Sequence, residues 1–124
     1  MFDSVLLLLV LLFTKHFVLD FILQTPYQFL NKGKYGHPGG ILHSGLQGIG
    51  TTLCFFIVDA DGMPVYLVFG LIDFLVHYHV DWLKVQLNTI YKLTQENPYY
   101  WWLLGADQYL HALTYIFLLS LVVP

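Results

Sequence analysis

Histidine and aspartate recur four residues apart within segments that are otherwise apolar. In chain order the pairs are His16 with Asp20, Asp73 with His77, His77 with Asp81, and Asp107 with His111. Residues four apart lie on one face of an α-helix, one turn above the other. Imidazole and carboxylate groups are common ligands of zinc, iron and manganese, and helical bundles build metal sites from such groups on facing helices. The spacing therefore predicts polar stripes on several helices with a metal site between them.

The predicted metal ligands are members of these stripes. They are His16, Asp20, His43, His77, Asp81, Asp107 and His111. Four further residues are expected to support the ligands by hydrogen bonds, namely Gln24, Gln47, Asp73 and Gln108. Of these, Asp73 can equally be a ligand or the partner of a threonine or backbone group. The set is large enough for one divalent ion or for two, with zinc favoured.

The chemistry expected of such a site is hydrolysis. The stripes carry no serine or cysteine to act as a covalent nucleophile, so a metal-activated water is the expected nucleophile. Asp20 and Asp81 are the expected catalytic residues, either of them acting as the base. Three other interpretations stay open: hydrogen-bonded pairs that only join the helices, a proton relay, and a haem held by paired histidines.

The elements that must position these residues are membrane helices. Hydrophobic residues make up 57% of the chain, charged residues make up 10%, and the mean hydropathy is +0.65. A soluble domain of this length needs a more polar surface, and a membrane span needs about 20 apolar residues. The predicted fold is an all-α integral membrane four-helix bundle with a polar His/Asp core. It forms a single domain over residues 1–124, with spans at about 3–25, 41–58, 64–87 and 98–123.

Lysine placement predicts the orientation of the bundle. Lys32 and Lys34 fall in the first predicted loop, and Lys84 and Lys92 lie around the third. The positive-inside rule puts these loops in the cytoplasm and both termini on the other side of an inner membrane. The expected partners are the lipid bilayer and other membrane subunits. A nucleic-acid partner is excluded because the chain has no arginine and no basic patch.

Local signals add detail to this outline. Asp61 and Asn97 each lie shortly before a proline and are predicted to cap the third and fourth helices. Lys15 and Lys84 are expected to extend toward the membrane surface or to pair with an aspartate. His79 lies off the stripe that carries His77, so it is not expected to be a ligand.

The motifs also resemble a known family. The pattern runs from His16-x-x-x-Asp20-x-x-x-Gln24 through His43 and His77-x-x-x-Asp81-x-x-Lys84 to Asp107-Gln108-x-x-His111. Over nearly the whole chain it resembles an uncharacterised family of small four-helix membrane proteins of bacteria and their phages, known as a domain of unknown function. More loosely, it is similar to inner-membrane proteins described as metal-dependent hydrolases. The resemblance implies a metal and a prokaryotic or phage source, and it names no substrate.

Together these features predict an intramembrane metal-binding protein. The expected activity is metal-dependent hydrolysis of a lipid-like or amphipathic substrate. The alternatives are a non-catalytic small subunit of a larger membrane complex and a haem-binding subunit for electron transfer.

Overall fold

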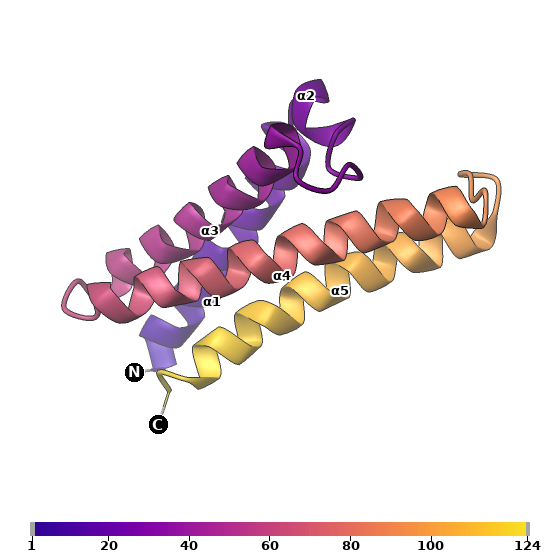
Figure 1. Cartoon of the computed structure of the whole chain (residues 1–124). Coiled ribbons are helices and arrows are strands. Elements are labelled where there is room, and N and C mark those ends of the chain that lie inside the picture. The colour runs from indigo at the N-terminus through magenta and orange to yellow at the C-terminus, as the bar shows by residue number, and fades with distance from the viewer. Residues whose placement is uncertain (1, 124) are drawn as a thin grey trace.

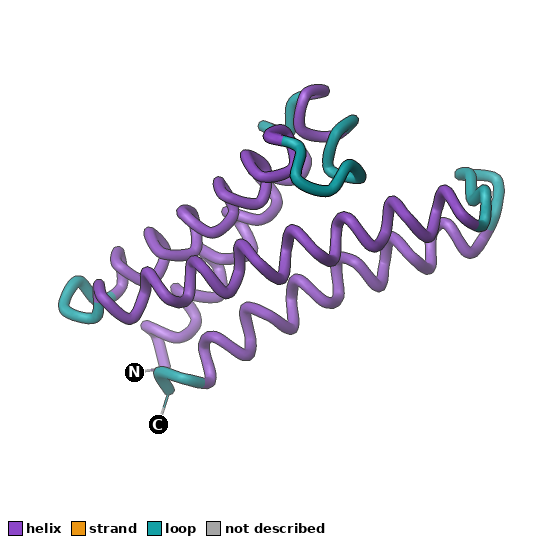
Figure 2. Tube along the Cα trace, viewed as in Figure 1, coloured by secondary structure: helices purple, strands orange, loops and turns teal. Residues whose placement is uncertain are grey.

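The computed structural model describes residues 2–123, and over that range the protein is all-α (Figures 1 and 2). Its elements in chain order are α1 (Phe2–Phe17), the π-helix η1 (Val18–Ile22), α2 (Pro26–Phe29), α3 (Pro38–Val58), α4 (Met63–Ile90) and α5 (Pro98–Ser120). The long helices therefore alternate with short connections, the arrangement typical of antiparallel helical bundles.

The long helices pack with their ends aligned at one side and splayed at the other. Both termini and the turn between α3 and α4 lie at the same end of the molecule (Figure 1). At the opposite end, α2 covers α3, while the turn between α4 and α5 lies apart from it. The aligned end holds an apolar layer with contributions from all four long helices, including Leu12, Phe55, Phe69, Tyr115 and Leu118. This layer closes the end of the bundle that carries the termini.

Three helices in the described range are long and apolar enough to cross a membrane. They are Asp3–Ile22, Pro38–Val58 and Met63–Ile90. Large apolar side chains such as Val10, Ile49 and Leu67 are more than half exposed, whereas His77 and Asp73 are fully buried. An apolar exterior around a polar interior suits a lipid environment, because an ionisable group facing lipid is costly. The structure thus supports membrane association.

The first helix ends earlier than its predicted span of 3–25. The α-helix gives way to the π-turn Val18–Ile22, closed by a hydrogen bond of 2.8 Å from the Leu23 N–H to the Val18 carbonyl oxygen. Pro26 then starts the separate α2, because it has no N–H to continue a helix and disfavours a helical residue before it. Asp20 lies inside the π-turn and is buried. Turns of this type are often found at functional sites.

Two other helix starts depend on side-chain caps. Helix α3 begins at Pro38 rather than at 41, because His37 Nδ1 accepts the Gly39 N–H at 3.0 Å. Helix α5 begins at Pro98 with the predicted cap, in which Asn97 Oδ1 accepts the Tyr99 N–H at 2.9 Å. Two C-terminal ends also differ from the predicted spans. Helix α4 continues to residue 90 instead of 87, and α5 stops at residue 120 instead of 123.

The predicted cap of α4 by Asp61 is wrong. Gly62 occupies the cap position, and no side chain accepts a hydrogen bond there. Asp59 organises the turn instead, since it accepts the Tyr66 hydroxyl at 2.6 Å and the Asp61 N–H at 3.1 Å. These two hydrogen bonds lower the pKa of Asp59.

Close packing of α3 against α4 depends on two glycines. A Cβ atom added to Gly48 would collide with the Gly70 carbonyl oxygen, and one added to Gly70 would collide with Thr52 Oγ1. Small residues at such crossings let membrane helices approach closely. The approach matters to the interior, because α3 and α4 carry His43 and His77.

Replacement of Gly48 by valine should destabilise the protein. Because the added side chain meets backbone, we expect Gly48→Val to cost about 1–3 kcal/mol, the usual range for overpacking. The matched control is Gly45→Val on the same helix, where a Cβ atom would meet nothing within 4 Å. Thermal unfolding in detergent measures both variants. Equal stability of the two would contradict the glycine contact.

Candidate metal centre

Four buried side chains lie close together at the centre of the bundle. They are Asp20 from η1, His43 from α3, and His77 and Asp81 from α4, which we call the central group. His43 Nε2 lies 3.1 Å from His77 Nε2, 3.1 Å from Asp20 Oδ1 and 3.2 Å from Asp81 Oδ2. His77 Nε2 lies 3.3 Å from Asp20 Oδ1 and 3.4 Å from Asp81 Oδ2. All four residues are at most 6% exposed.

The separations that involve the histidine nitrogens are close to those between the donors of a tetrahedral metal ion. Donors about 2.0–2.1 Å from a tetrahedral ion, as in zinc sites, are about 3.3–3.4 Å from one another. The five separations given above lie between 3.1 and 3.4 Å. Two histidine nitrogens facing each other also need a proton or a cation between them. The central group therefore has the atoms and the spacing to hold a divalent ion.

A second group lies beside the first and shares Asp81. His111 Nε2 is 3.5 Å from Asp81 Oδ1 and 3.2 Å from Asp107 Oδ1. These three atoms are buried, yet none makes a hydrogen bond to another described residue. They are close to one another without being aligned as donor and acceptor, as expected of ligand atoms that surround a common point. The His77 and His111 rings stack with centroids 3.9 Å apart.

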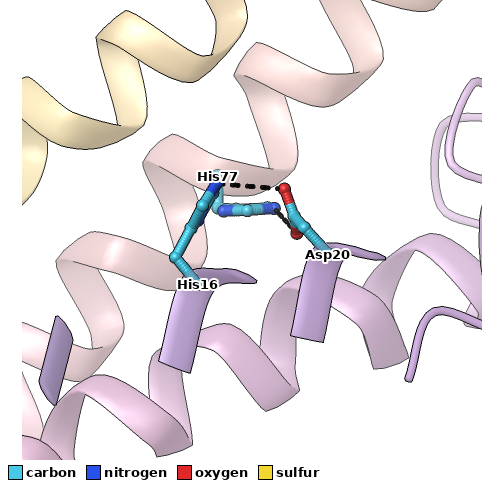
Figure 3. A group of neighbouring side chains, drawn as sticks. All are labelled: His16, Asp20 and His77. Atoms are coloured by element: carbon cyan, nitrogen blue, oxygen red, sulfur yellow. Dashed lines mark ion pairs between the residues drawn. The ribbon is translucent and has the colours of Figure 1, made fainter. Parts of the chain in front are cut away.

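His16 completes a third group on the other side of Asp20. Its Nε2 lies 3.2 Å from Asp20 Oδ2, while Asp20 Oδ1 faces His77 (Figure 3). His16 Nδ1 also lies 2.9 Å from the Tyr115 hydroxyl. Three sets of residues each have ligand atoms within 4.8 Å of one another. They are His16 with Asp20 and His77, His43 with His77 and Asp81, and Asp81 with Asp107 and His111. His77 and Asp81 thus each belong to two of these sets.

Amide side chains hold several of these residues in place. Gln47 Nε2 donates to Asp20 Oδ1 at 2.6 Å, and Gln108 Nε2 donates to Asp107 Oδ2 at 3.0 Å. Gln24 also bonds to Asp20, but its amide donates to the main-chain oxygen of Asp20 and not to the carboxylate. The reason is that the helix has ended before residue 24.

Gln28 contacts the central group, although the sequence pattern does not predict it. Its Oε1 lies 3.3 Å from His43 Nδ1, so Nδ1 can donate and leave Nε2 free to accept or to bind an ion. Gln28 lies on α2, which folds back over the start of α3. A signal existed in Thr25-Pro26, which marks a new helix start, and Thr25 does accept the Gln28 N–H.

Two lysines neutralise the carboxylates. Lys32 Nζ lies 3.2 Å from Asp81 Oδ2, and Lys84 Nζ lies 2.7 Å from Asp107 Oδ2. Lys84 therefore pairs with an aspartate, one of the two outcomes expected for it. Lys32 is predicted only to lie in a cytoplasmic loop, yet the residue is 6% exposed. Its position in a loop does not predict that the side chain points into the protein.

Asp73 belongs to a separate polar cluster nearer the apolar layer. Its Oδ2 accepts Lys15 Nζ at 2.9 Å and the Thr51 hydroxyl at 2.6 Å. Lys15 also donates to the Tyr115 hydroxyl at 3.0 Å and to Gln47 Oε1 at 2.8 Å. Of the two roles left open for Asp73, the structure places it as the partner of a threonine and a lysine. This cluster is connected to the metal-site residues, because Tyr115 also contacts His16 and Gln47 also donates to Asp20.

Comparison with known proteins gives the chain a family. Residues 8–124 match the model of a family described as a protein of unknown function, DUF3307. The chain belongs to the DUF3307 family. No curated protein matches it, and no solved structure matches it. All residues of the three groups lie within the stretch that matches DUF3307, and the family description assigns them no chemistry.

Breaking the Lys15–Asp73 pair should destabilise the fold. Lys15→Met leaves a buried carboxylate without its cation, which typically costs about 3–5 kcal/mol. The double variant Lys15→Met with Asp73→Asn should recover most of this loss, because the amide is neutral and can still accept from Thr51. Thermal unfolding in detergent measures both. A single variant as stable as the wild type would show that the pair contributes nothing.

Proposed function

We propose that this DUF3307 protein is an intramembrane metal-binding protein that acts as a metal-dependent hydrolase. The observation that carries the proposal is the spacing around His43 and His77, whose Nε2 atoms lie 3.1–3.4 Å from each other and from one oxygen each of Asp20 and Asp81. A group of this kind, buried in an apolar protein, needs positive charge at its centre to offset the carboxylates.

Zinc is the proposed ion. Two imidazole nitrogens and two carboxylate oxygens form a borderline donor set, and a tetrahedral arrangement is typical of zinc. The unpartnered atoms of Asp81, Asp107 and His111 favour a second ion beside the first. In that arrangement Asp81 would be shared by the two sites, since its Oδ2 faces His43 and His77 and its Oδ1 faces His111.

The proposed reaction uses water as the nucleophile. When bound, a divalent ion lowers the pKa of a coordinated water and polarises the group that is attacked. Asp20 is the proposed base, with Asp81 as the alternative. Asp20 lines a cavity of about 590 Å³ that opens away from the apolar layer. Water and substrate would therefore enter from the splayed end of the bundle.

The proposed location is the inner membrane, with four spans and both termini on the non-cytoplasmic side. Helix α5 is the proposed fourth span, since its 23 residues measure about 35 Å at 1.5 Å per residue. It lies along α4 and buries Asp107 and His111 against it (Figure 1). Lysine placement supports the orientation, which puts the splayed end and its cavity in the cytoplasmic half.

Metal content tests the central group directly. We expect about one to two ions per chain in protein purified in mild detergent. His77→Ala removes one of the proposed metal ligands. Loss of a residue that only hydrogen-bonds to a ligand typically weakens metal affinity roughly 10–100-fold, so we expect His77→Ala to weaken it by more than that. The control is His79→Ala on the same helix, since His79 is exposed and its ring nitrogens lie within hydrogen-bond distance of the Tyr35 hydroxyl and the Leu75 carbonyl oxygen, away from the central group. Elemental analysis measures all three proteins.

The same samples separate the proposal from its rivals. A protein without stoichiometric metal would be a scaffold whose polar residues only join the helices. Visible absorbance of a haem would point to electron transfer. Equal metal loss in the His77 and His79 variants would place the ion elsewhere.

Membrane topology can be tested with single cysteines. In a Cys54→Ala background, Glu96→Cys lies between α4 and α5, Asp61→Cys lies between α3 and α4, and Ser120→Cys lies at the end of α5. An impermeant maleimide should label Asp61→Cys and Ser120→Cys from outside the inner membrane, and Glu96→Cys only after lysis. Labelling of Ser120→Cys together with Glu96→Cys would mean that α5 does not cross.

A further inference from the structure

The cavity beside the central group carries positive charge next to the proposed metal. It has a volume of about 590 Å³ and lies between the segment that follows η1 and the paired helices α4 and α5. Asp20 reaches it from the metal side, and Lys32 and Lys84 line it as well. These lysines belong to different segments, so the fold brings two cations together at one opening.

A bound metal would add positive charge to this region. The carboxylates of Asp20, Asp81 and Asp107 lie near the ammonium groups of Lys32 and Lys84. A divalent ion would offset two of the three carboxylate charges, and a second ion would offset more. The lysine ammonium groups would then no longer be required as partners of the carboxylates and could bind an anion in the cavity.

Part of the cavity wall is apolar. Phe21, Phe29 and Leu30 line it, and each is more than half exposed, while polar side chains such as Asn88 and Thr89 line another part. Val85 and Leu104 face it from α4 and α5. Apolar side chains next to charged ones fit a molecule with an anionic head and a hydrocarbon tail, because burying the tail away from water lowers the free energy.

We propose that the substrate is a phosphorylated amphiphile whose phosphate is held by Lys32 and Lys84 beside the metal. Phosphate suits the site because it accepts several charge-assisted hydrogen bonds, and lysine binds it as a point charge. This inference rests on the proposed function, since the positive charge depends on the bound ion. The apolar wall selects a lipid phosphate over a free phosphate ion.

The reaction that follows is hydrolysis of a phosphate ester. The oxygen of water forms a new bond to phosphorus, and the bond from phosphorus to the lipid oxygen breaks. The carboxylate of Asp20 takes a proton from the water, and one proton ends on the departing alcohol. The products are a lipid alcohol and inorganic phosphate, with no change of oxidation state.

Binding of dodecyl phosphate tests the proposal. A ligand that binds the folded state raises the unfolding temperature, so zinc-loaded protein in a neutral maltoside detergent should be stabilised by dodecyl phosphate. Dodecyltrimethylammonium, with the same chain, should not stabilise it, and inorganic phosphate should need a much higher concentration. Lys32→Gln and Lys84→Gln should each weaken dodecyl phosphate binding roughly tenfold to a hundredfold.

Two further variants guard against a loss of folding. Lys34→Gln is the matched control, because Lys34 is exposed and bonds only to Asn31, and it should bind as the wild type does. Lys32→Arg keeps the charge and should retain binding. Equal binding by wild type and both glutamine variants would overturn the role of the lysines, and equal potency of inorganic phosphate would overturn the amphiphile.

Metal analysis of the same samples distinguishes the two levels of failure. Metal-loaded protein that ignores dodecyl phosphate would overturn the substrate class and leave the metal-binding proposal standing. Protein that holds no metal would overturn both. Release of inorganic phosphate from dodecyl phosphate, lost in Asp20→Asn, would support the hydrolytic step.

Discussion

The arrangement of this protein depends on the cost of burying charge among apolar helices. Each carboxylate inside the bundle must face a cation, an imidazole or a donor, because lipid offers none. Asp73 meets Lys15, Asp107 meets Lys84, and Asp81 meets Lys32. Satisfying these groups together fixes how each long helix is rotated about its own axis. The exterior is then free to be almost wholly apolar, as the exposed leucines and phenylalanines show.

Two local features of the backbone make the convergence geometrically possible. Gly48 and Gly70 let α3 and α4 approach closely, which brings His43 Nε2 to 3.1 Å from His77 Nε2. The π-turn at the end of α1 holds Asp20 against both histidines. Both features carry a local cost, since glycine weakens a helix and a π-turn is rarely favourable. Their presence where the polar groups meet indicates that the centre, and not helix propensity, determines the local structure.

Sequence spacing predicted the residues on regular helices and failed where the chain departs from a helix. His77, Asp81, Asp107 and His111 could be found because a period of four on α4 and α5 puts them on one face. Gln24 bonds to the main chain of Asp20 and not to its carboxylate, because the first helix ends before residue 24. Gln28 and Lys32 could not be found by periodicity, since α2 and the following turn fold back over the bundle, and that reversal depends on tertiary contacts. The distances between the polar atoms could not be predicted from the sequence either, because they depend on the distances between helices.

The two ends of the bundle differ in a way that bears on function. The end with the termini is filled by an apolar layer that includes Leu12, Phe55 and Leu118, so a polar path across the whole bundle is interrupted there. At the other end, lysines reach the carboxylates from α4 and from the segment after α2. These cations explain how the carboxylates of Asp81 and Asp107 can be buried without a metal, because each pairing offsets desolvation. If a metal takes over this role, as we propose, it would free the lysines, and ion binding and anion binding at the cavity would be linked through the same carboxylates.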